Sequence, residues 1–228
     1  MDGRRSNYLN AIRAIAWKDL AAELRSRELL TSMLVFSTLI IMIFYFALDL
    51  DAKARDTIAA GVLWVTFAFA GTIGLNRAMA IEKDRGCLDG LLLAPVDRSA
   101  IYFGKMMSSL VFMLIVELIT LPIYSIFYNI NLFNLGFIGV ILLGSVGYTA
   151  VGTLLSTMTV QARTRDMLLP ILLFPVIVPV LVASVKASSG FLQDYPMSEI
   201  LPWLNILFAY DAIFLALSFV FFDFVVEE

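Results

Sequence analysis

Six stretches of about twenty mostly apolar residues run through the sequence, and they limit the folds open to the chain. A helix needs about 20 such residues to cross the hydrocarbon core of a bilayer. Lipid offers no water to pair backbone amides and carbonyls, so each stretch is predicted to be helical. The predicted spans are residues 30–48, 58–75, 106–128, 135–160, 167–185 and 203–222. The predicted fold class is therefore an all-α integral membrane protein, with residues 1–228 forming one transmembrane domain.

Composition supports the membrane class. Of the 228 residues, 61% are hydrophobic, which is more apolar surface than a soluble domain of this length can bury. The net charge of -3, without a basic cluster interleaved with aromatics, argues against a nucleic-acid partner. The first apolar stretch follows a long polar head and precedes Asp49, Asp51 and Lys53. We interpret it as a retained span rather than a cleaved signal peptide.

The basic residues predict the orientation. One side of the predicted membrane carries 13 of the 16 Lys and Arg residues, in the head, in segment 76–105 and in the fourth connection. They are Arg4, Arg5, Arg13, Lys18, Arg25, Arg27, Arg77, Lys83, Arg85, Arg98, Lys105, Arg163 and Arg165; Lys53, Arg55 and Lys186 lie on the other side. The positive-inside rule then places both termini and segment 76–105 in the cytoplasm.

The head, residues 1–29, is predicted to be an amphipathic helix on the cytoplasmic membrane surface. Its apolar residues recur at helical spacing: Leu9, Ile12, Ala16, Leu20 and Leu24. Trp17 suits an anchor at headgroup level. A solvated N-terminal helix is the alternative.

Segment 76–105 is charged although it lies between two spans, and we predict that it docks a cytoplasmic partner. The pattern predicts a helix over residues 81–94, interrupted at Gly86 and Gly90 and stopped by Pro95. Asp97 is a plausible N-cap for the helix that enters the third span. The leucines beside these charges form an exposed apolar patch that a plain loop would not need. They are Leu88, Leu91, Leu92 and Leu93.

Three features inside the spans suggest functional roles. The fourth span has hydroxyl residues every fourth position, which can serve helix packing or line a polar path. These residues are Ser145, Thr149, Thr153 and Thr157. The fifth span contains Pro170, Pro175 and Pro179, which predict kinks and either a hinged gate or a static bend. Two acids, Glu117 and Asp211, lie in apolar surroundings where a charge is costly, and they are candidate functional residues.

Segment 186–202, between the last two spans, is predicted to form short helices on the outer membrane surface. We expect Pro196 and Pro202 to interrupt them.

No catalytic or metal-binding pattern is present in the sequence. It has no phosphate-binding loop, no H-E-x-x-H, no nucleophile elbow and no histidine, and its one cysteine, Cys87, excludes an internal disulfide framework. These absences argue against an intramembrane enzyme and against a cofactor bound by this chain, and any ATP hydrolysis must occur on another chain. Without an imidazole, tight ligation of haem by this chain is not expected.

The arrangement of a head helix, six spans, a cytoplasmic docking segment and an outer element resembles ABC exporter permeases. More narrowly, the chain resembles the haem exporter protein B (CcmB) family of bacterial cytochrome c maturation. The run DRGCLDGLLLAPVDRSAIYFGK is similar to that family's D-G-x-L-E-x-L-x-L-x-P followed by a Lys. The matching residues are Gly86, Leu88, Asp89, Leu91, Leu93, Pro95 and Lys105. Arg85 departs from the pattern, because an acid often precedes the glycine.

The resemblance implies a permease of the bacterial inner membrane, with Mg-ATP bound by a partner ATPase (CcmA-like). It also implies a haem-handling membrane protein (CcmC-like), a small one-span subunit (CcmD-like) and a periplasmic haem chaperone (CcmE-like). Residues expected to couple to the ATPase are Glu82, Arg85, Gly86, Leu88, Asp89, Leu91, Leu93 and Pro95. Haem is the implied cargo, unless the ATPase serves to release the loaded chaperone. Two alternatives stay open: export of a lipid, polysaccharide or drug, and a scaffold that transports nothing.

Overall fold

The computed structural model describes residues 2–47, 52–84, 86–93, 96–129, 134–160, 162 and 164–225. Within these residues the chain is entirely helical apart from short connections. The helices are α1 (Asp2–Ser26), α2 (Glu28–Ala47), α3 (Ala52–Asp84), α4 (Cys87–Leu92), α5 (Arg98–Tyr128), α6 (Leu135–Thr159), α7 (Arg165–Leu192) and α8 (Met197–Val225). Six of them, all except α1 and α4, are long and apolar enough to cross a membrane. The predicted fold class and number of spans are confirmed.

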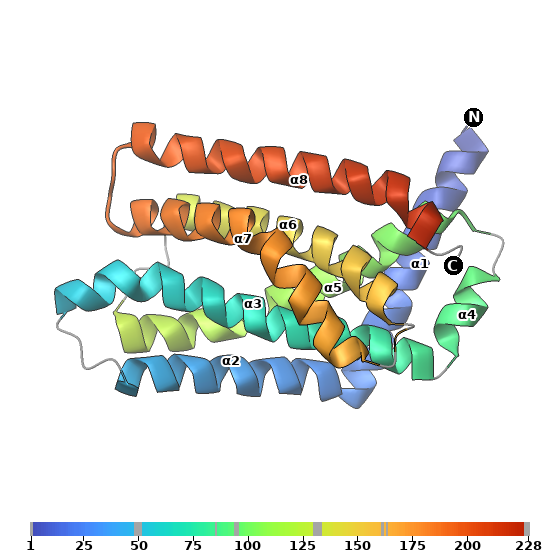
Figure 1. Cartoon of the computed structure of the whole chain (residues 1–228), viewed down its shortest axis with the longest axis horizontal. Helices are drawn as coiled ribbons and strands as arrows, with labels where there is room; N and C mark the ends of the chain where they lie inside the picture. The colour runs from blue at the N-terminus through green and yellow to red at the C-terminus, as the bar shows by residue number, and fades with distance from the viewer. Residues whose placement is uncertain are drawn as a thin grey trace.

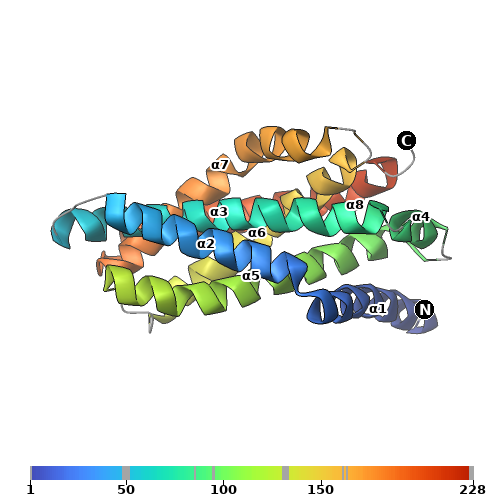
Figure 2. The same cartoon turned by 90° about the horizontal axis from the view of Figure 1, so that it is seen from below.

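The spanning helices lie along the long axis of the molecule, and α1 crosses one end of the bundle at a steep angle to α2 (Figure 1). The start of α1, helix α4 and the end of α8 lie at this same end (Figures 1 and 2). We call it the α4 end. This arrangement agrees with the predicted topology, in which both termini and segment 76–105 share one side.

The core of the bundle is built on α3 and α6, whose most apolar windows are 72% and 61% buried, compared with 22% for α2 and α8. Aromatic side chains with polar tips join these helices to their neighbours. Trp64 Nε1 donates to Ser188 Oγ at 2.9 Å, and the Tyr148 hydroxyl donates to the Ala68 carbonyl at 2.7 Å. Each buried polar tip is paired, so the rings are held in one orientation.

The hydroxyl residues of the fourth span are buried inside the bundle. Thr149 donates to the carbonyl of Ser145 and Thr157 to that of Thr153, both on their own helix, while Ser145 reaches a side chain of α5. Hydroxyls bonded back to their own helix need no water. These contacts favour helix packing, but Thr153 Oγ1 has no hydrogen-bond partner among the described residues, and a polar path remains a prediction.

Helix α7 remains continuous through its three prolines but changes direction about midway (Figures 1 and 2). A proline frees the carbonyl four residues before it, so the bend falls where the helical hydrogen-bond ladder is interrupted. The Tyr210 hydroxyl of α8 donates to the Val176 carbonyl at 3.0 Å, which supplies a donor within this interrupted stretch. A moving gate remains a prediction.

The predicted short outer helices are wrong. Helix α7 continues without a break through Lys186 to Leu192, and α8 already begins at Met197. Pro202 lies inside α8 and does not interrupt it. The carbonyl that Pro202 leaves free belongs to Ser198, an exposed residue at the start of the helix, where water can pair with it.

Helix α1 packs on α5 with a face that overlaps only part of its predicted apolar stripe, since Leu20 packs against a buried cluster while Leu9 and Leu24 are exposed. The buried residues are Ile15 and Glu23, which lie on the same face as the half-buried Asp19. Leu9, Trp17 and Leu24 are 65%, 66% and 63% exposed. One face of α1 packs on the bundle, and the choice between a helix on the membrane surface and a solvated helix for its other face remains a prediction. The exposed apolar face remains our predicted contact with membrane lipids.

A single residue, Arg27, separates α1 from α2, and its φ of 57° lies in the left-handed region. The Glu23 carboxylate accepts a hydrogen bond from the Leu30 amide at 2.9 Å, which caps the first turn of α2. The sharp bend thus depends on a strained residue and on a buried acid.

We expect Arg27→Gly to raise the free energy of unfolding by about 1 kcal/mol, because glycine adopts positive φ without the cost that other residues incur. Arg25→Gly, two residues earlier inside α1, should lower it by about as much. Denaturant titration of the purified protein in detergent measures both. Equal destabilisation by the two variants would contradict the strain at Arg27.

Candidate coupling site

The predicted docking segment is assembled from the end of α3, the short helix α4 and the start of α5. Glu82 lies in the last turn of α3, and Gly86, with φ of 64°, separates α3 from α4. Leu88 and Asp89 belong to α4, although the structure describes only their backbone. Two predicted coupling residues, Arg85 and Pro95, lie outside the described residues.

The predicted helix over residues 81–94 is wrong in its bounds. Helix α3 continues from its span through residue 81 to Asp84, and a new helix, α4, runs only from Cys87 to Leu92. The break falls at Gly86 because a positive φ ends a right-handed helix, and glycine adopts it at little cost. The segment is therefore formed largely by the ends of the long helices α3 and α5.

Asp97 occupies the predicted N-cap position of α5. Its backbone is extended, with φ of -62° and ψ of 134°, but its side chain makes no capping hydrogen bond. The position is confirmed, while the predicted side-chain cap is absent.

The leucines of the docking segment have different surroundings. Leu91 packs against a buried cluster formed by Ile15, Ile101 and Tyr102, so it holds α4 against α1 and α5. Leu93, just after α4, is 86% exposed. Of the two, Leu93 is the apolar side chain available to a partner.

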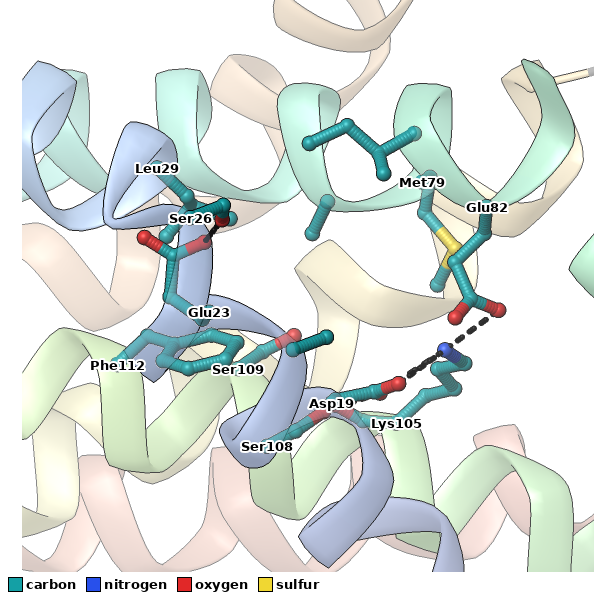
Figure 3. Close-up of a pocket in the computed structure, with 13 residues that line it drawn as sticks. Asp19, Glu23, Ser26, Leu29, Met79, Glu82, Lys105, Ser108, Ser109 and Phe112 are labelled. Carbon is teal, nitrogen blue, oxygen red and sulfur yellow. Dashed lines mark hydrogen bonds and ion pairs between the residues drawn. The ribbon is translucent and has the colours of Figure 1, made fainter. Parts of the chain in front are cut away.

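Four charged residues form an ion-pair cluster at the end of α3, which we call the Lys105 cluster: Lys18, Asp19, Glu82 and Lys105. The ammonium of Lys105 lies 2.9 Å from Asp19 Oδ2 and 2.7 Å from Glu82 Oε2 (Figure 3). Lys18 Nζ lies 2.6 Å from Glu82 Oε1 and 3.3 Å from Asp19 Oδ1. The cluster thus joins α1, α3 and α5.

The charged groups of the Lys105 cluster stabilise one another's ionised forms. Burial lowers the pKa of Lys18, but its hydrogen bond to Glu82 and the charge of Asp19 raise it more, so its pKa lies above the usual value. Ser108 Oγ also donates to Asp19 Oδ2 at 3.0 Å. The carboxylate of Asp19 is thereby held by three side chains.

Sequence reasoning missed this cluster. It named Glu82 as a coupling residue and Lys105 as part of the family pattern, but it did not predict that they pair, and it did not consider Asp19. The available signal was the spacing of Ile15, Asp19 and Glu23, which repeats every four residues and places two acids on the face of an apolar residue.

A cavity of about 60 Å³ adjoins the Lys105 cluster, with room for a few water molecules. Its polar lining includes Asp19, Glu23, Glu82 and Lys105, and its apolar lining includes Phe112 (Figure 3). Among the described residues, no group of three His, Cys, Asp or Glu could hold a metal ion.

Further polar contacts surround the end of α3. Arg77 pairs with Glu28 of α2 at 2.7 Å, and Arg165 of α7 pairs with Asp84 at 3.2 Å. Asn76 donates to Asp166 of α7 at 2.9 Å. The end of α3 is therefore connected through side chains to α1, α2, α5 and α7.

The two predicted intramembrane acids both lie against α6. Glu117 of α5 is 1% exposed and accepts a hydrogen bond from Ser145 Oγ at 2.6 Å. Asp211 of α8 is 6% exposed, and its carboxylate lies so close to Gly147 that a Cβ there would be 2.3 Å from Oδ1. Residues 145 and 147 point to opposite sides of a helix, so the acids flank α6 and do not meet.

Asp211 has no hydrogen-bond partner for either carboxylate oxygen among the residues that the structure describes. Two polar residues that precede Asp211 on α8 do not pair with it, because the Tyr210 hydroxyl donates to the Val176 carbonyl and Asn205 is exposed. Sequence proximity on α8 does not bring these groups together, since helical neighbours point in different directions.

The architecture, six candidate spans with a helical segment projecting from α3 and α5, is that of a multi-pass membrane permease. Comparison with known proteins narrows the class. The model of the CcmB protein family matches residues 10–225, and the chain belongs to this family. The resemblance found in the docking segment is thereby confirmed over nearly the whole chain.

Curated relatives carry the name heme exporter protein B. That of Rhodobacter capsulatus is 24% identical over 192 residues, which cover 82% of this chain and 88% of the relative. That of Pseudomonas aeruginosa is 23% identical over 176 residues, which cover 77% of this chain and 79% of the relative. That of Bradyrhizobium diazoefficiens is 22% identical, with 83% and 86% covered.

Proposed function

We propose that this chain is the permease subunit of an ABC-type haem export system of bacterial cytochrome c maturation, in the inner membrane with both termini cytoplasmic. The observation that carries the proposal is the family match over residues 10–225, with relatives named heme exporter protein B. The excess of Lys and Arg at the α4 end supports the cytoplasmic placement of that end.

In this proposal a separate CcmA-like subunit binds Mg-ATP and docks at α4. Leu93 provides an exposed apolar contact, while Leu91 fixes α4 to the permease. Since α3 and α5 continue from the segment into the membrane, movement of α4 reaches the bundle directly.

The remaining proposed partners are a CcmC-like haem-handling protein, a CcmD-like one-span subunit and a CcmE-like periplasmic chaperone. The chain has no histidine, which favours a permease that relays motion to release the haem-loaded chaperone over one that ligates haem itself. A scaffold without transport is the second candidate, favoured by the same observation.

We expect Leu93→Asp to reduce copurification of the ATPase subunit at least tenfold, because a charged side chain replaces an exposed apolar contact. Leu135→Asp is the matched control, since Leu135 is 83% exposed at the start of α6, at the opposite end of the bundle. Affinity purification followed by measurement of ATP turnover gives both readouts. Wild-type yield of the ATPase with Leu93→Asp would contradict docking at this residue.

The cargo is tested by deleting the gene and restoring it in the native bacterium. Loss of covalently bound haem in c-type cytochromes, recovered on complementation, supports the proposed function. Normal cytochromes together with loss of a surface lipid or polysaccharide would instead assign the permease to another cargo. ATP-dependent haem flux in vesicles that contain only the permease and its ATPase would exclude the scaffold.

A further inference from the structure

We propose that Lys105 is a positioning residue that makes α1 follow the end of α3 when the coupling segment moves. This inference rests on the proposed function, because it assumes that a partner ATPase drives α4. It adds a specific connection that the docking residues alone do not supply, namely from α3 to the head helix.

One lysine joins two helices. The side chain of Lys105 is only 6% exposed and is paired with Asp19 of α1 and Glu82 of α3, whose side chains are 11% and 13% exposed. Lys18 makes a second bridge between the same two carboxylates. Two ammonium and two carboxylate groups balance in charge, so the cluster is stable only while α1, α3 and α5 keep their positions.

The Lys105 cluster connects α1 with α3 across a cavity. Helix α1 packs mainly on α5, and the cavity of about 60 Å³ lies between the two carboxylates of α1 and the end of α3 (Figure 3). The ion pairs are therefore a principal contact between α1 and α3. A shift of Glu82 must either move Asp19 or separate buried charges, and separating them is costly.

Other ion pairs at the end of α3 are less able to transmit movement. Arg77 and Glu28 are 44% and 55% exposed, and the Asp84 carboxylate that pairs with Arg165 is 64% exposed. Water and salt screen such pairs, and they rearrange at little cost. Lys105 and its two carboxylates are 6%, 11% and 13% exposed, which makes their pairs the more rigid connection, although Lys18 at the edge of the cluster is as exposed as Arg77.

Position along the chain supports the same role. Glu82 is in the last turn of α3, and Gly86 and α4 follow immediately. Only four residues therefore separate Glu82 from the start of α4. At the other side of the cluster, α1 presents the exposed Leu9, Trp17 and Leu24, so its displacement would move an apolar face against the membrane surface.

The test separates a connecting role from a structural one. Lys105→Met leaves the two carboxylates with Lys18, which is 44% exposed, as their one cation, and should lower both the melting temperature and cytochrome maturation, maturation at least tenfold. The triple variant Asp19→Asn, Glu82→Gln, Lys105→Met leaves no such buried charge unpaired. It should regain the melting temperature, keep ATP turnover within twofold of wild type, and still mature cytochromes at least tenfold less. Lys105→Arg should retain function, and Arg77→Gln is the control for an exposed pair.

Hydrogen–deuterium exchange of the permease–ATPase complex, with and without ATP, gives the direct readout. We expect ATP to change deuterium uptake in α1 of the wild type and not in α1 of the triple variant. Restored maturation in the triple variant, or an equal α1 response to ATP in both proteins, would overturn the inference while leaving the proposed function intact. If the wild type binds no ATPase subunit at all, the proposed function fails and the inference fails with it.

Discussion

Gly144→Val is expected to lower the free energy of unfolding by about 3 kcal/mol, because it forces a side chain into a filled part of the core. A Cβ at Gly144 would lie 2.2 Å from Trp64 Cη2 and 2.5 Å from Ser184 Oγ. Trp64 is 1% exposed and its ring is held by the hydrogen bond to Ser188, so it has little freedom to move away. Glycine at this position lets α6 approach α3 and α7 closely.

The matched control is Gly139→Ala, one and a half turns earlier in α6, where an added Cβ meets nothing within 4 Å. Alanine there should raise the free energy of unfolding by about 0.5–1 kcal/mol, because it reduces the freedom of the unfolded backbone. Unfolding in mixed detergent micelles measures both variants. Trp64→Leu in the Gly144→Val background should recover part of the loss, and strictly additive effects of the two changes would contradict the proposed clash.

Asp211→Asn is expected to lower cytochrome maturation at least tenfold without lowering stability. The carboxylate of Asp211 is buried against Gly147, and neither oxygen has a hydrogen-bond partner among the described residues. An unpaired acid in apolar surroundings costs free energy, so its neutral amide of the same shape should leave stability unchanged or slightly raised. A residue that lowers the free energy of unfolding is a candidate for a functional role.

Glu199→Gln is the control, because Glu199 lies exposed in the first turn of the same helix. Covalent haem in c-type cytochromes reports activity, and denaturant titration reports stability. Normal maturation with Asp211→Asn would remove this acid from the functional residues. A clear loss of stability would show instead that Asp211 has a structural role.

The fold could be predicted largely from apolar stretches and charge. Residues 30–48, 58–75 and the four later stretches each lie mostly within a helix of the structure, because lipid demands paired backbone groups whatever the neighbours are. The ends of the helices were predicted less accurately. Helix α3 extends to Asp84 and α7 to Leu192, since packing and ion pairs support helix beyond the apolar window.

The candidate site could be predicted only in part. The break at Gly86 was expected from its residue type, and the apolar patch from its leucines. The sequence could not predict which leucine remains exposed. Leu91 is covered by α1, which is distant in sequence, and by α5, whose direction after the connection cannot be read from the sequence.

By itself, the sequence determined an all-α membrane fold with six spans, because composition acts through the solvent and needs no tertiary contact. The cytoplasmic side and the docking role of segment 76–105 remain predictions from its charge. Only the tertiary structure decided that Lys105 lies between Asp19 and Glu82, and that Glu117 and Asp211 flank α6 without meeting. These relations depend on how helices rotate and cross. A rotation of α1 by one residue would turn Asp19 away from Lys105 while leaving the hydropathy pattern unchanged.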